Sequence, residues 1–238
     1  MRAPYGLELT ENCQSCRLRS EGHFCRLSPA ALKAFEAIKF TTSYPEGAVL
    51  FVEEEAARGV FVLCKGRVKL SMTSCDGKTV ILKIVNSGEV LGLNATVSGR
   101  PYQATAETLE PCQVNFVKRE DFLRLLREHA EASIRVAQEL SNDYQVACEQ
   151  IRSLGLSHSV PQRLARFLLD SCAKGQETKQ GIRVRLALTH EEIGQAIGTS
   201  RETVTRAFGE FKNQQVVSLN GASLVIQNKA ALESFAGI

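Results

Sequence analysis

The chain has 238 residues, of which 44% are hydrophobic, so it is long enough for one large or two ordinary domains with proper cores. No early apolar run has the length of a signal peptide, and no stretch approaches the roughly 18–20 apolar residues of a membrane span. We therefore expect a cytoplasmic globular protein without a membrane partner. The net charge of +3 is too small to identify a partner by itself.

Residues 1–28 form a cysteine-rich N-terminal loop. Cys13, Cys16 and Cys25 lie close together in a polar, Arg-rich stretch without clear periodicity, which indicates a loop rather than a core. In a cytoplasmic chain such a group points to metal or redox chemistry rather than to a structural disulfide. His23 could complete a zinc site locally, and Cys13 with Cys16 could form a redox-sensing thiol pair. The isolated cysteines are expected to be structural: Cys64, Cys75, Cys148 and Cys172.

Residues 29–129 are predicted to form a β-roll. A short helix over 29–38 precedes short apolar or alternating runs from about Thr41 to Val117, which are separated by regularly spaced glycines. This spacing is typical of a double-sheet jelly roll. Cys112 alternates with Val114 and Phe116, so it could simply be a small core residue of a strand. Jelly rolls also host metal enzymes, but the histidines are scattered and no nucleophile–base set is visible, so we do not expect an enzyme.

Two helices follow the β-roll. REDFLRLLREH predicts an amphipathic helix, and a longer helix is expected from about Glu131 to Leu154, within a dimerisation segment over 130–155. Small and apolar residues recur in the longer helix at alternating steps of four and three, which predicts the seam of a parallel dimer. Packing of this helix on its own β-roll is the alternative. After Ser133, the predicted interface residues are Ala137, Leu140, Tyr144, Ala147, Ile151 and Leu154.

Residues 156–238 contain closely spaced signals for helices, strands and turns. A hinge is expected at Gly155 to Ser159, and Pro161 opens a helix that is followed by a polar loop, GQETKQG, and a strand, RVRLALT. Thr189 and Glu192 predict a capping box at the start of the next helix. That helix is expected to end at a glycine, and a second capped helix begins directly after it, which suggests a helix-turn-helix.

The second helix of this pair sorts its residues by face. Val204, Phe208 and Phe211 are spaced to pack inward, which leaves Arg201, Glu202, Thr205 and Arg206 together on the other side. An arginine can fork onto guanine, and a carboxylate can accept from the amine of cytosine, although a solvated charged face is the alternative. Two apolar runs joined by Asn220-Gly221 then predict a hairpin wing.

The segment TSRETVTRAF and the wing resemble the DNA-binding domain of the cyclic AMP receptor protein and fumarate–nitrate reduction regulator (Crp/Fnr) family. The resemblance covers most of the chain from about residue 12. It implies an α+β fold with an N-terminal jelly-roll β-roll like a cyclic-nucleotide-binding domain, a long dimerisation helix and a C-terminal winged helix-turn-helix. It also implies a homodimeric transcription regulator that binds inverted repeats in double-stranded DNA and contacts RNA polymerase.

The resemblance assigns residues to DNA reading. Arg201, Glu202 and Arg206 occupy the positions that contact bases in the family, and Arg201 matches the cyclic AMP receptor branch. We therefore expect a TGTGA-like half-site. The complete predicted set is Ser200, Arg201, Glu202, Thr205 and Arg206.

The resemblance also suggests a cofactor. Cys112 corresponds to the distant fourth cysteine of the oxygen-sensing branch, so Cys13, Cys16, Cys25 and Cys112 are predicted to hold an oxygen-labile [4Fe–4S] cluster. The alternative is the same regulator with structural zinc or free thiols and a small organic ligand or heme in the β-roll.

Cyclic AMP is not expected as a ligand. The cyclic AMP branch carries a glutamate soon after a glycine and an Arg-Ser pair farther along the chain. Here Leu93 and Asn94 follow Gly92, and Gln103 and Ala104 stand near the Arg-Ser position. The residues that would hold a cyclic phosphate are therefore missing.

Overall fold

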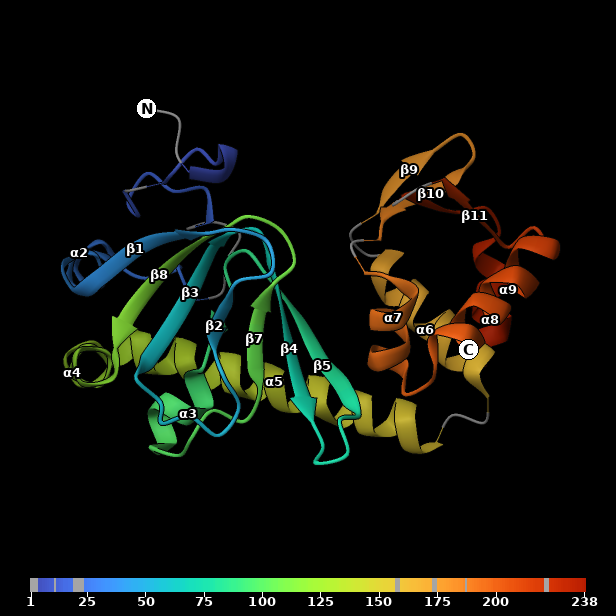
Figure 1. Cartoon of the computed structure of the whole chain (residues 1–238). Coiled ribbons are helices and arrows are strands. Elements are labelled where there is room, and N and C mark those ends of the chain that lie inside the picture. Colours follow the sequence, from blue (N-terminus) through green and yellow to red (C-terminus); the bar gives the residue numbers. More distant parts are fainter. Residues whose placement is uncertain are drawn as a thin grey trace. The chain divides into compact units, whose positions relative to one another are not determined.

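The first half of the chain folds as two four-stranded antiparallel sheets, as the jelly-roll prediction requires (Figure 1). The computed structural model describes residues 4–10, 12–18, 24–156, 159–172, 175–186, 188–220 and 223–238. One sheet has the strand order β1-β8-β3-β6 and the other β2-β7-β4-β5. The strands are β1 Lys39–Tyr44, β2 Val49–Phe51, β3 Gly59–Lys65, β4 Arg67–Thr73, β5 Thr79–Asn86, β6 Val90–Leu91, β7 Thr105–Thr108 and β8 Cys112–Lys118.

Two cores lie on opposite faces of the β1-β8-β3-β6 sheet. Alternate residues of β3 and β8 point to opposite sides, because successive side chains of a strand alternate between its faces. Leu63, Cys112 and Val114 pack between the two sheets. Val62 and Val117 instead pack on the outer face, where the N-terminal segment and helices cover the sheet.

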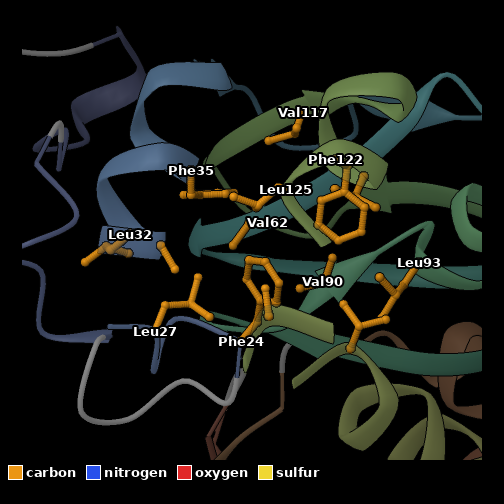
Figure 2. Close-up of a cluster of buried hydrophobic side chains, with 14 residues drawn as sticks. Phe24, Leu27, Leu32, Phe35, Val62, Val90, Leu93, Val117, Phe122 and Leu125 are labelled. Atoms are coloured by element: carbon orange, nitrogen blue, oxygen red, sulfur yellow. The ribbon is translucent and has the colours of Figure 1, made fainter. Parts of the chain in front are cut away.

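Helices close the outer core. The helix α2, Pro29–Ile38, has the predicted bounds, and the Ser28 hydroxyl caps its first turn. Figure 2 shows Phe24 and Leu27 from the N-terminal segment beside side chains of this helix. The other helical elements of this half are η1 Pro4–Gly6, α3 Leu93–Ser98, α4 Arg119–Glu128 and α5 Ala130–Leu156.

The short helix α3 was not predicted from the sequence. Gly92 and Gly99 flank this short helix, and both adopt left-handed backbone conformations. The predicted hinge is also partly wrong, because Gly155 is still helical and α5 ends at Leu156. Residues 157 and 158 of that hinge lie outside the described residues.

The second half contains a helix-turn-helix and a small sheet of order β11-β12-β10-β9 (Figure 1). The segment predicted as a polar loop contains a short edge strand, β9, and a C-terminal helix, α9, was not predicted. The elements are α6 Val160–Cys172, β9 Gln176–Thr178, β10 Gly181–Arg185, α7 His190–Ile197, α8 Arg201–Asn213, β11 Val217–Asn220, β12 Ser223–Ile226 and α9 Lys229–Ala236.

The chain divides into two units, Met1–Ala147 and Cys148–Ile238, so the boundary falls within α5. In the described part of the chain, none of the helices combines the length and apolar character that crossing a bilayer requires.

Candidate DNA-reading helix and cysteine site

Local signals position α7 and the turn that follows it. The Thr189 hydroxyl accepts from the Glu192 backbone N–H at 3.2 Å, and the Glu192 carboxylate accepts from the Thr189 N–H at 2.9 Å, so the predicted capping box is confirmed. Gly198 ends the helix with a φ of 67°, a conformation that glycine adopts without strain. A Cβ on Gly194 would lie 2.7 Å from the Thr199 carbonyl oxygen, so a glycine there lets the turn close against α7.

The recognition helix α8 has one buried and one exposed face. The prediction that Val204, Phe208 and Phe211 pack inward is confirmed, because all three are buried. The Ser200 hydroxyl caps the helix by accepting from the Thr203 N–H at 3.3 Å. All five residues predicted to read DNA are exposed on this helix or its cap: Ser200, Arg201, Glu202, Thr205 and Arg206.

Two of the exposed side chains, Glu202 and Thr205, already form hydrogen bonds within the protein. The pKa of Glu202 is lowered by a hydrogen bond to its own backbone N–H and by the Ser200 hydroxyl, which favours the ionised acceptor. The Thr205 hydroxyl donates to the Arg201 carbonyl at 2.9 Å and also lies 2.9 Å from His190 Nδ1. Thr205 is therefore already engaged within the protein.

His190 supports the recognition helix from α7. Its ring stacks on Phe208 with centroids 5.0 Å apart and an interplanar angle of 12°. Burial lowers the pKa of His190, and the charges of Lys212 and Arg201 lower it further. The imidazole therefore stays neutral at pH 7 and acts as a packing and hydrogen-bonding group.

The wing is a two-stranded hairpin. β11 pairs with β12 antiparallel from Val217 opposite Ile226 to Asn220 opposite Ser223. Residues 221 and 222, which include the glycine of the predicted Asn220-Gly221 turn, lie outside the described residues. The strand pair follows α8 directly, as a wing requires.

The cysteine loop is fastened to the β-roll. Asn12 Oδ1 accepts from the Gln14 N–H at 2.8 Å, and the Cys16 N–H donates to the Cys13 carbonyl at 3.3 Å, which forms a tight turn. The Cys13 N–H donates to the carboxylate of Glu36 on α2. Cys13 and Cys25 are both half-buried against the outer core.

The thiol of Cys64, which belongs to β3, lies near the thiols of this loop. Burial raises the pKa of Cys25 to about 12, and the thiols of Cys64, Cys13 and Cys16 raise it further by repulsion. Burial likewise raises the pKa of Cys64 to about 12, with Cys13 and Cys16 as the next causes. Cys64 was expected to be an isolated structural cysteine, but it lies within electrostatic range of the loop thiols.

These pKa shifts concern two thiols outside the Cys13 and Cys16 pair that was predicted for redox sensing. A thiol with a pKa of about 12 is almost entirely protonated at neutral pH, and the thiolate is the reactive form. Cys25 and Cys64 are therefore poor redox-sensing thiols in the metal-free protein. Metal binding would deprotonate them.

Cys112 is not brought to the other predicted ligands. It is fully buried between the two sheets, and its Sγ lies 3.1 Å from the Glu110 carbonyl oxygen and 3.4 Å from that of Arg67. Cys13 and Cys25 pack on the opposite face of the same sheet. Cys112 is therefore a small core residue of its strand, which is the alternative interpretation suggested by its alternation with Val114.

The donor chemistry fits a thiolate-bound metal, because thiolates are the common ligands of iron–sulfur clusters and of structural zinc. Among the described residues, no three Cys, His, Asp or Glu side chains are already arranged to hold one ion. Binding would therefore require the thiols to draw together. His23, the alternative zinc ligand, lies outside the described residues.

The segment compared with the cyclic-phosphate site is filled by neutral contacts. Asn94 Nδ2 donates to Gln103 Oε1 at 2.8 Å, and Leu93 is buried. The buried Tyr102 stacks on Phe51 with centroids 4.1 Å apart, and its hydroxyl donates to the Gly59 carbonyl at 2.8 Å.

The predicted interface residues of α5 divide into two groups. Leu140 packs against the outer core with Val136, so it belongs to the contact of this helix with its own β-roll rather than to an exposed seam. The side chains of Tyr144 and Ile151 are each 71% exposed. Ala137, Ala147 and Leu154 are also exposed. Ile134 is 60% exposed on the same helix, although it was not among the predicted interface residues.

Two family models match the chain. A cyclic nucleotide-binding domain matches residues 41–129, and a Crp-like helix-turn-helix domain matches residues 162–235. Together they cover the β-roll and the winged helix.

Relatives of known function are transcription regulators rather than enzymes. The chain is 30% identical over 211 residues to a global nitrogen regulator from Synechocystis, which covers 87% of this chain and 88% of the relative. It is 26% identical over 184 residues to the cAMP-activated global transcriptional regulator CRP of Salmonella typhimurium, covering 77% and 87% of the two chains. The structure of FixK2 from Bradyrhizobium japonicum has the same fold, with a TM-score of 0.74, 23% identity and coverage of 83% of this chain and 97% of that one.

Proposed function

Because the chain belongs to the Crp/Fnr family of DNA-binding transcription regulators, we propose that it is a homodimer whose DNA binding is controlled by a [4Fe–4S] cluster. Three of the cluster ligands are Cys13, Cys16 and Cys25. The observation that carries the proposal is the attachment of the Cys25 segment to α5, the helix with the exposed apolar side chains.

That attachment covers three successive turns of α5. The Ser28 backbone N–H donates to Glu131 Oε2 at 3.0 Å, and the Ser28 hydroxyl also donates to this carboxylate. One turn later Arg135 Nε donates to the Arg26 carbonyl at 3.3 Å.

The third turn brings a carboxyl group to the cysteine itself. The Glu139 side chain is buried and close enough to Cys25 to raise the pKa of that thiol. A change in ligation at Cys25 would therefore act on the charge balance and the hydrogen bonds that hold α5 in place.

The DNA-reading chemistry follows from α8. Arg201 and Arg206 can each present a guanidinium fork to a guanine, while Glu202 can accept from the exocyclic amine of cytosine. A TGTGA-like half-site supplies these partners, and two copies related by two-fold symmetry would read an inverted repeat. Thr205 is the weakest contributor, because its hydroxyl is engaged with Arg201 and His190.

The dimer is expected to form along the exposed side chains of α5. Replacing Ile151 by glutamate should convert the dimer to a monomer, because opposing carboxylates in an apolar seam repel each other at a cost of several kcal/mol. Analytical ultracentrifugation would measure this change. The matched control is Asn142→Glu, at an exposed position of the same helix. A dimer that survives Ile151→Glu would move the interface elsewhere.

When bound, a [4Fe–4S] cluster supplies sensitivity to oxygen or nitric oxide.

We propose no role for cyclic AMP. This proposal is supported by the neutral Asn94–Gln103 pair and the buried Leu93, which stand where the cyclic AMP branch carries charged groups. Contact with RNA polymerase is proposed on the family resemblance.

The test is purification under strict anaerobiosis, with an absorption spectrum, iron, sulfide and zinc analysis, and DNA affinity before and after exposure to air. We expect about four irons and four sulfides per chain and a visible absorption band that bleaches in air. The affinity for a TGTGA-like inverted repeat should change by roughly 5–150-fold at the same time. A colourless protein with the same DNA affinity in air and under nitrogen would refute control by a cluster.

A further inference from the structure

We infer that Cys64 of β3, rather than Cys112, is the fourth thiol of the set formed by Cys13, Cys16 and Cys25. This inference rests on the proposed metal-binding function. It assigns a ligand to a cysteine that has no neighbouring cysteine in the sequence.

The first support is the face of the sheet. On β3, Leu63 points into the core between the sheets, whereas Val62 points to the outer face. Alternation from Leu63 therefore sends Cys64 outward, toward the face that Cys13 and Cys25 cover.

A β-bulge reinforces this placement. The pairing of β3 with β8 shifts between Leu63 and Lys65, so Cys64 is the extra residue of the bulge. The bulge returns Lys65 to the outer face, where its ammonium group donates to the Glu8 carbonyl of the N-terminal segment. The opposing Gln113 is hydrogen-bonded to the backbone of Thr10 at 2.7 and 2.8 Å. The N-terminal segment thus lies directly over this part of the sheet.

The polar surroundings suit a thiolate at Cys64. Asn115 Nδ2 donates to Cys64 Sγ at 3.1 Å, and the same amide is held through its oxygen by the Thr41 hydroxyl at 2.8 Å. Lys39 Nζ donates to Cys13 Sγ at 3.3 Å and is close enough to Cys64 to favour its ionised form. Donors of this kind around ligand sulfurs stabilise thiolate-bound clusters.

Cys112 lacks such a path to the loop. An added Cβ on Gly66 would collide with its Sγ, so this sulfur is packed against the chain at the start of β4. To join the loop thiols it would have to pass from one face of its strand to the other. Such a change would disrupt the pairing of β8 with both β1 and β3.

The test compares the full-length variants Cys64→Ser and Cys112→Ser, purified anaerobically beside the wild type. The wild type and Cys112→Ser should carry about four irons, and Cys64→Ser should lose most of its iron, because the cluster is held by four thiolates. Circular dichroism and DNA affinity in the metal-free state check that each variant is folded. If Cys64→Ser retained its iron and Cys112→Ser lost it, the assignment of Cys64 would be overturned, but the proposed cluster itself would not. A wild type without iron would instead refute the cluster itself.

Thiol alkylation of the wild type gives a second readout that needs no substitution. Under nitrogen, iodoacetamide should modify the exposed Cys75 and Cys148 but spare Cys64 together with the three loop cysteines. Because burial raises the pKa of Cys25 and Cys64 to about 12 in the folded metal-free chain, Cys64 and the loop cysteines should be alkylated together once the metal is removed with a chelator and the chain is unfolded in denaturant. Alkylation of Cys64 in protein that retains its full iron content would overturn the inference.

Discussion

Replacing Phe24 by alanine is expected to destabilise the N-terminal unit by about 3–5 kcal/mol, the usual cost of truncating a buried phenylalanine. The Phe24 side chain is only 1% exposed, although it belongs to the segment before the first long helix. Its ring centroid lies 5.7 Å from that of Phe35 on α2 and 5.9 Å from that of Phe122 on α4 (Figure 2). The substitution would therefore open a cavity where three segments meet.

Thermal or denaturant unfolding, followed by a probe of the β-roll, measures this loss. Phe40→Ala is the matched control, because Phe40 is 53% exposed on β1, and we expect it to cost no more than about 0.5 kcal/mol. The Phe24→Ala protein should also retain less metal, since Phe24 anchors the neighbouring Cys25 to the core. A cost below about 1 kcal/mol would contradict the anchoring role.

Replacing Arg201 by alanine is expected to remove about 1–3 kcal/mol of discrimination at one G·C pair of each half-site. Arg201 is exposed in the first turn of α8, where side chains of a recognition helix reach base edges. The effect on an inverted repeat should double, because both protomers lose the contact. Titration of the wild type and the variant against repeats with and without this G·C pair measures the difference.

Arg201→Lys separates charge from base reading. Lysine keeps the positive charge but lacks the planar fork, so this variant should retain most of its general DNA affinity while losing part of the discrimination. Unchanged discrimination in Arg201→Ala would remove Arg201 from the base-reading set.

The winged helix was largely predictable from the sequence because its signals are local. Each of these signals acts over at most one helical turn. They are the capping box of Thr189 and Glu192, Gly198 at the end of α7 and the Ser200 cap of α8. The inward face of α8 follows from helical spacing alone. Two short elements were not predicted. The helix α3 has only six residues and lies between two glycines, and the edge strand β9 consists of three polar residues, so neither is long enough to show a periodic pattern.

The cysteine site and the helix seam depended on long-range structure. Sequence placed Cys13, Cys16 and Cys25 in one loop, but only the register of β3 and β8 decides that Cys64 faces this loop while Cys112 faces the other core. Periodicity likewise put Leu140 in a seam, since it cannot tell a face that packs on its own β-roll from one that meets a second copy. The sequence thus determined the elements whose signals act within a few residues. The tertiary structure decided which side chains from distant elements share a face, because strand pairing and core packing set that neighbourhood.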